Sequence, residues 1–171
     1  MKKSNQNEIA NLIKSFRYAF RGFVFAVNNE RNMRIHIVVA ILVAVFSFLY
    51  GLEAVQYALI FLCFGLVIAA EMFNTAIEAL VNLETPAYDH LARIAKDVAA
   101  GAVLVSAIMT VVVAVFTFHD LNRLWETVVL IVTTPVLLVC FLLLIALGLF
   151  FIFGCTGKVK PQDSKNDNYK S

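Results

Sequence analysis

The stretch AVQYALIFLCFGLVIAAEMFNTAIEAL, residues 54–80, decides the fold of this chain. Its first part, Ala54 to Ala70, carries no charged side chain, and its last part carries two glutamates. A transmembrane helix needs about 20 predominantly apolar residues, whereas a membrane strand alternates polar and apolar side chains over about 10 residues. The stretch does not alternate, so we expect a membrane-spanning helix here.

Two more stretches, 98–118 and 128–153, also lack charged residues. Over all 171 residues the chain is 61% hydrophobic and 15% charged, whereas soluble domains are about 45–50% apolar and about 25% charged. A chain of this length suits one compact bundle. The sequence therefore predicts an all-α integral membrane protein.

The order of these segments gives the expected domain organisation. Apolar residues recur every three or four positions in 8–29, between basic residues, which is typical of an amphipathic surface helix. Residues 1–120 are expected to form one membrane domain, and a polar tail is expected to be disordered. The expected segments are the surface helix 8–29, spans at about 35–52, 54–80 and 97–118, an additional C-terminal transmembrane segment within 121–156, and the tail 157–171.

The basic residues indicate how these spans are oriented. Every lysine and arginine except Arg123 lies in the N-terminal 34 residues, in the link after the second span, or in the tail. Positive charge concentrates on the cytoplasmic side of membrane proteins. We therefore expect a multi-pass plasma-membrane protein with both termini, and the polar end of the second span, in the cytoplasm.

The segment EMFNTAIE, residues 71–78, carries the clearest chemical signal. Glu71, Asn74, Thr75 and Glu78 are spaced so that they share one face of a helix. A charged side chain within a membrane helix costs about 2.5 kcal/mol or more, although Glu78 can reach water at the helix end. Paired carboxylates can hold Mg²⁺ together with phosphate oxygens, and the deeper Glu71 suits a general base acting on a lipid hydroxyl.

Further charged residues lie near the same membrane face. Lys96 offers a point charge for a phosphate, and the adjacent Asp97 can cap the third span. Glu30 is either a third carboxylate of the site or a solvated turn residue. The sequence contains no phosphate-binding Gly-x-x-x-x-Gly-Lys loop, and no basic groove with interleaved aromatics that would indicate a nucleic-acid partner.

Four ordered blocks stand out: KSFRYAFRG (14–22), NERNMRIH (29–36), EMFNTAIE (71–78) and AKDVAAGAVL (95–104). They give the chain, from about residue 12 to 119, a resemblance to the prokaryotic diacylglycerol kinase family. It looks most like the Gram-positive branch that acts on undecaprenol. The resemblance implies an ATP-dependent bacterial lipid kinase, a homotrimer of chains with a surface helix and three spans, and active sites shared between subunits at the cytoplasmic interface.

The family's site residues carry over by position. The resemblance makes Glu71 the general base and makes Glu30 and Glu78 the ligands of a Mg²⁺ that bridges the ATP phosphates. It makes the lipid alcohol and ATP the substrates, with Glu71 accepting the proton of the alcohol. The residues that it places at ATP are Tyr18, Glu30, Asn74, Glu78, Tyr88, Lys96 and Asp97.

Two features depart from the family pattern, and several interpretations stay open. Asn82 stands where an acidic residue is common, and the fourth apolar stretch exceeds the usual three spans, with no Pro-Ser-Gly-His element of a fused lipid phosphatase. The resemblance implies undecaprenol as the preferred substrate and diacylglycerol as the alternative. Carboxylates within a membrane also occur in ion- or proton-binding transporters, and an inactive membrane scaffold is a third possibility.

Overall fold

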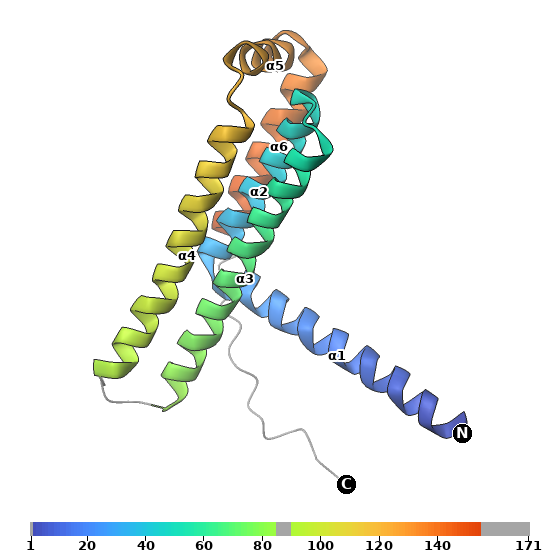
Figure 1. Cartoon of the computed structure of the whole chain (residues 1–171), viewed down its shortest axis with the longest axis vertical. Coiled ribbons are helices and arrows are strands. Elements are labelled where there is room, and N and C mark those ends of the chain that lie inside the picture. The colour runs from blue at the N-terminus through green and yellow to red at the C-terminus, as the bar shows by residue number, and fades with distance from the viewer. Residues whose placement is uncertain (1, 85–89, 155–171) are drawn as a thin grey trace.

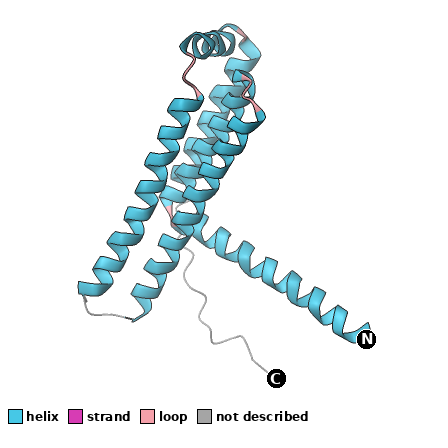
Figure 2. Ribbon diagram, viewed as in Figure 1, coloured by secondary structure: helices cyan, strands magenta, loops and turns pink. Residues whose placement is uncertain are grey.

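The computed structural model describes residues 2–84 and 90–154, with side chains for 8–82 and 90–154. The described chain is helical and contains no strand (Figure 2). Four helices, α2, α3, α4 and α6, are long and apolar enough to cross a membrane, which confirms the predicted all-α membrane fold with an extra C-terminal span. The helices are α1 (Lys2–Asn29), α2 (Arg31–Tyr50), α3 (Ala54–Glu84), α4 (His90–Thr117), α5 (Leu121–Thr133) and α6 (Pro135–Gly154).

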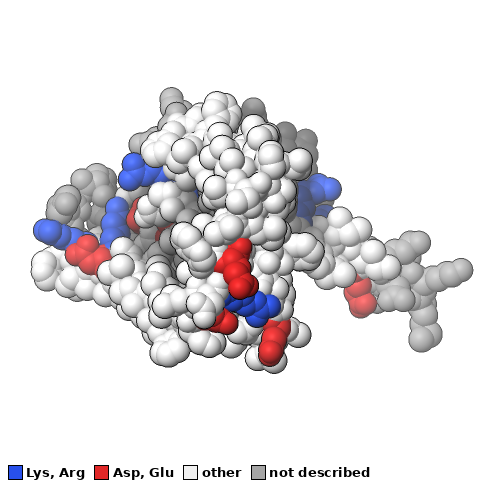
Figure 3. Space-filling model, turned by 90° about the horizontal axis from the view of Figure 1, so that it is seen from above, with Lys and Arg blue, Asp and Glu red and all other residues white. Residues whose placement is uncertain are grey.

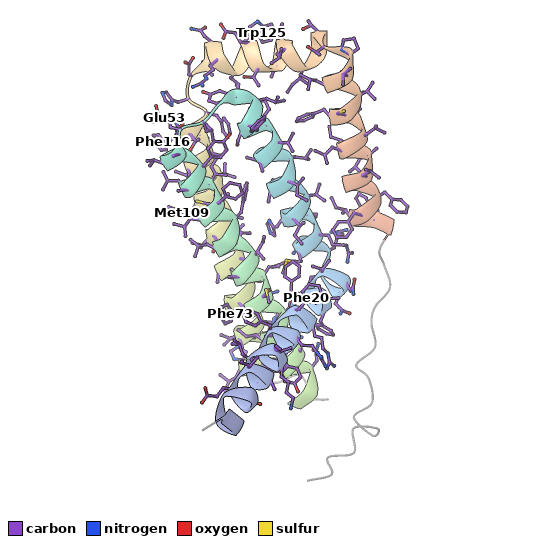
Figure 4. All side chains as sticks on the ribbon, turned by 90° about the vertical axis from the view of Figure 1, so that its right-hand side faces the viewer. Phe20, Glu53, Phe73, Met109, Phe116 and Trp125 are labelled. Carbon is purple, nitrogen blue, oxygen red and sulfur yellow. The ribbon has the colours of Figure 1, made fainter. Side chains whose placement is uncertain are left out.

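The four long apolar helices run alongside one another (Figure 1). Helix α3 packs along α4 and α2, and α6 packs against α2 on the side away from α3 and α4 (Figure 4). Helix α1 projects away from one end of this bundle, and α5 lies across the other end. Seen from above, at the end that carries α5, the surface is mostly uncharged, with small groups of charged side chains (Figure 3).

The end of the bundle that carries α5 is built around the turn after α2. Gly51 adopts a left-handed conformation (φ 73°), and its N–H donates to the Ser47 carbonyl at 2.9 Å. Glycine is the residue that adopts this conformation without steric cost. Behind the turn, the Tyr50 ring packs edge to face against Phe118 at 5.1 Å between centroids, which joins the ends of α2 and α4.

The predicted third span, 97–118, corresponds to a helix that starts earlier than the span. Helix α4 begins at His90, so Asp97 lies inside the helix and cannot be its N-cap. The polar residues before the third span are compatible with a helix that extends beyond the membrane. Because α4 begins at His90 and α3 ends at Glu84, few residues separate the two helices.

The fourth apolar stretch is also interrupted. Pro135 has no N–H and disfavours the helical conformation at the preceding residue, and Thr134 is extended (ψ 105°). Asp120 caps the separate helix α5 by accepting hydrogen bonds from the N–H groups of Asn122 and Arg123, each at 3.1 Å. The predicted surface helix 8–29 is α1, which starts earlier than expected, and the predicted tail 157–171 lies outside the described residues.

Candidate active site

The centre of the site is Glu71 on α3, which is 1% exposed. The Asn32 side chain, in the first turn of α2, forms a hydrogen bond with its carboxylate. The Thr75 hydroxyl donates to the Glu71 backbone carbonyl at 2.9 Å. The carboxylate oxygen Oε1 is buried and has no hydrogen-bond partner. A buried acceptor in this state is costly unless it binds a proton donor or a cation.

Three carboxylates gather around this position. Glu30, in the link between α1 and α2, and Glu78, two turns along α3, both lie near enough to repel the charge of Glu71. The backbone of Glu30 is extended (φ −105°, ψ 119°), and its side chain makes no capping hydrogen bond to α2. Three carboxylates from two parts of the chain therefore concentrate negative charge at one end of the bundle.

Asn74 completes this polar face. Its Nδ2 donates to Glu78 Oε1 at 3.1 Å, while its own Oδ1 is buried and without a partner. The face thus holds carboxylate and amide oxygens, which are the ligands that Mg²⁺ and Ca²⁺ prefer. Among the described residues, no three His, Cys, Asp or Glu side chains are placed to hold a metal by themselves. The oxygens therefore fit Mg²⁺ that keeps further ligands from phosphate or water.

A cation from α4 lies further along the same side of α3. Lys96 Nζ donates to Asn82 Oδ1 at 2.8 Å, and Asn82 follows Glu78 by one helical turn. The neutral amide positions the ammonium group without cancelling its charge. Asp97, by contrast, is exposed and lies 4.0 Å from the Arg93 guanidinium, also exposed. An exposed pair of this kind contributes little to stability.

The structure thus brings together Glu30, Glu71, Asn74 and Glu78, with Lys96 reaching α3 one turn further on. Tyr18 is 63% exposed on α1, the helix that projects from the bundle. Tyr88 lies outside the described residues.

Two residues of this region were not predicted as site residues. Asn32 was not assigned a role, although an amide in the first turn of a membrane helix is a polar group that needs a partner. Arg34 was interpreted only as a topology determinant, yet it is 4% exposed. The distribution of basic residues along the sequence does not show that this arginine is buried.

Comparisons by sequence match this chain to one family profile and to several named enzymes. The sequence profile described as prokaryotic diacylglycerol kinase matches residues 17–118. A Synechocystis diacylglycerol kinase is 42% identical over 114 residues, which are 66% of this chain and 65% of that protein. A Bacillus subtilis undecaprenol kinase is 38% identical over 116 residues, which are 68% of this chain and 94% of that protein.

An Escherichia coli diacylglycerol kinase is 30% identical over 109 residues, or 64% of this chain and 89% of that protein. No solved structure gives a significant match. The profile match ends at residue 118, so α5 and α6 lie beyond it, and the matched region covers slightly less than two thirds of the Synechocystis protein.

Proposed function

The chain belongs to the prokaryotic diacylglycerol kinase family, and we propose that it is a lipid kinase that transfers the terminal phosphoryl group of ATP to the hydroxyl of a membrane lipid. The names of its relatives are those of phosphotransferases with an alcohol acceptor. The single observation that carries the proposal is the buried, unpartnered Oε1 of Glu71 on a membrane-spanning helix. A lipid hydroxyl at that depth can donate its proton to this oxygen.

The neighbouring groups support the same reaction. Enzymes that transfer phosphoryl groups act largely by positioning and by stabilising charge. Glu71 accepts the proton of the alcohol, and Asn32 holds its carboxylate in place. The charge of the Lys96 ammonium group is not neutralised by its partner Asn82, so it can stabilise the negative charge of the phosphates.

We propose that Glu30 and Glu78 hold Mg²⁺, with Asn74 beside them. The ion supplies charge neutralisation to the ATP phosphates when it is bound. The unpartnered Oδ1 of Asn74 supports an electropositive ligand at this place.

The remaining ATP contacts are proposed from the family pattern. Tyr18, Tyr88 and Asp97 would lie on the adenosine side. Because Tyr18 is exposed on a helix that leaves its own bundle, its contribution to ATP binding suits a site shared between neighbouring copies. We therefore propose a homotrimer in the bacterial plasma membrane, with the active sites and both termini in the cytoplasm.

Undecaprenol is the proposed lipid and diacylglycerol the alternative. The Bacillus undecaprenol kinase is matched over 94% of its own length, and the Synechocystis diacylglycerol kinase has the higher identity, 42%. The test offers both lipids, in separate and in mixed micelles, to the purified full-length protein with Mg²⁺ and radiolabelled ATP. Label in undecaprenyl phosphate that exceeds label in phosphatidic acid supports the proposal, and the opposite ratio selects the alternative.

A further inference from the structure

Arg34 is a buried arginine that joins three helices. It lies in the first turn of α2 and is 4% exposed. Its Nη1 donates to the carbonyls of Val27 at 2.9 Å and Asn28 at 3.1 Å, both in the last turn of α1. Its Nε donates to the carbonyl of Ile152 at 3.2 Å, in the last turn of α6.

These acceptors share one electrostatic property. The last four carbonyls of a helix have no partner within the helix and carry the negative end of its dipole. One guanidinium therefore binds the C-terminal ends of two helices, α1 and α6. Arginine is suited to this role because it presents several donors in a fixed planar arrangement.

Other contacts fix α6 so that its end stays on Arg34. At Gly148, helix α6 approaches α2 so closely that a Cβ added to this glycine would lie 2.6 Å from Val38 Cγ1. At the opposite end, Arg123 of α5 donates to the Gly51 carbonyl at 2.6 Å, and its guanidinium stacks over the Tyr50 ring at 4.8 Å from the centroid. The α5–α6 segment is thus attached to α2 at both ends.

Two residues of the candidate active site lie in the turn between α1 and α2 that Arg34 holds together. Glu30 and Asn32 lie between the α1 carbonyls and Arg34 in sequence, and Asn32 contacts Glu71. The Glu30 N–H donates to the Ala26 carbonyl at 2.8 Å, so the turn continues directly from α1. Anything that holds the end of α1 against α2 also holds Glu30 and Asn32 in place.

We propose that the C-terminal span α6 is part of the machinery that positions the active site, and that it acts through Arg34. By placing its C-terminus on the Arg34 guanidinium, α6 fixes the α1–α2 turn, and with it Glu30 and Asn32, opposite Glu71. Arg34 is then a positioning residue. The inference rests on the proposed function only for the roles of Glu30 in metal binding and of Asn32 in holding Glu71; the control of the turn by α6 is independent of it.

A passive anchor makes a different prediction. If α6 only fastened the chain to the membrane, a small outward shift of α6 would leave the α1–α2 turn unchanged. Gly148→Leu in the full-length protein produces such a shift, because Gly148 has no room for a side chain against Val38. Leu149→Phe is the matched control, since it adds bulk at the next position, where the side chain is 51% exposed.

The first readout is amide hydrogen exchange over residues 26–33, measured without ATP or metal. We expect Gly148→Leu to speed exchange by about tenfold, as when a hydrogen bond from a charged donor is lost, and Leu149→Phe to leave it unchanged. The second readout is the Mg²⁺ concentration that half-saturates activity. We expect it to rise by about tenfold because Glu30 is displaced, and we expect kcat to fall because Asn32 no longer holds the Glu71 carboxylate in place.

Arg34→Lys and Gly148→Ala extend the test should Gly148→Leu fail to fold. Arg34→Lys keeps the charge but loses the planar set of donors, and it should act on the turn in the same direction. Unchanged exchange over 26–33 in all folded variants would overturn the proposal. If the wild-type protein transfers no phosphate, the proposed function fails, and the exchange data still decide whether α6 controls the turn.

Discussion

The substitution Glu71→Gln separates catalysis from stability at one residue. Glutamine keeps the shape of the side chain and can still accept the hydrogen bond from Asn32, but it cannot accept a proton from an alcohol. General base catalysis contributes about 100- to 10,000-fold to a rate. We therefore expect the kcat of lipid phosphorylation to fall by at least about 100-fold.

The same change should stabilise the fold. Glu71 is 1% exposed, its Oε1 has no partner, and Glu30 and Glu78 repel its charge. A buried polar group without a partner costs about 1–3 kcal/mol, and more when it is charged. Glutamine keeps an unpartnered polar atom but removes the buried charge and its repulsion by Glu30 and Glu78. The unfolding free energy should therefore rise, and each 1 kcal/mol raises Tm by about 2–4 °C in a chain of this size.

Both quantities can be measured on one preparation in detergent micelles, by radiolabel transfer into lipid and by thermal unfolding. Glu53→Gln is the matched control, because Glu53 is exposed and lies at the end of the bundle that carries α5 (Figure 4). It should change neither quantity. Kinase activity of Glu71→Gln within a few fold of the wild type would refute the role of Glu71, and a lower Tm would refute the electrostatic reasoning.

Three further substitutions test other parts of the structure. Lys96→Met removes the charged donor that we propose for the ATP phosphates. It should lower kcat/KM for ATP by about 10- to 100-fold without changing Tm, as measured by steady-state kinetics and thermal unfolding; an unchanged kcat/KM would contradict the proposed role of Lys96. Gly51→Ala places a Cβ at a residue with a left-handed backbone (φ 73°) and 3.0 Å from Arg123 Nη2. The free energy of unfolding, measured in detergent, should fall by about 1–2 kcal/mol; an unchanged value would contradict the turn geometry. Asp120→Ala removes the cap of α5 and should lower the unfolding free energy by about 1 kcal/mol. Kinase activity should stay normal, because the close approach of α6 to α2 at Gly148 remains; a lost activity would show that this approach alone does not hold α6 in place.

The sequence predicted the spans and the polar face because both follow from strong local constraints. A carboxylate within an apolar helix is costly, so Glu71 is conspicuous, and helical periodicity alone places Asn74 and Glu78 beside it. The family was predicted from the four motif blocks, and the profile match confirms it. The lipid kinase class is supported by the names of the relatives.

Other features depend on contacts between distant segments. Arg34 looks like any basic residue beside a membrane, and only the arrival of the α6 terminus at Ile152 shows that it is buried. Asn32 acquires its role from Glu71, which is far away in sequence. The break between α5 and α6 had a local signal in Pro135, but the apolar residues on both sides concealed it.

Phosphorus NMR of the purified full-length protein with ATP, Mg²⁺ and a lipid alcohol tests the central claim most directly. The account predicts that a phosphomonoester signal of the lipid grows as ADP forms, one for one, and that neither appears with Glu71→Gln. Formation of ADP without lipid phosphate, or no turnover of ATP by folded wild-type protein with either lipid, would contradict it.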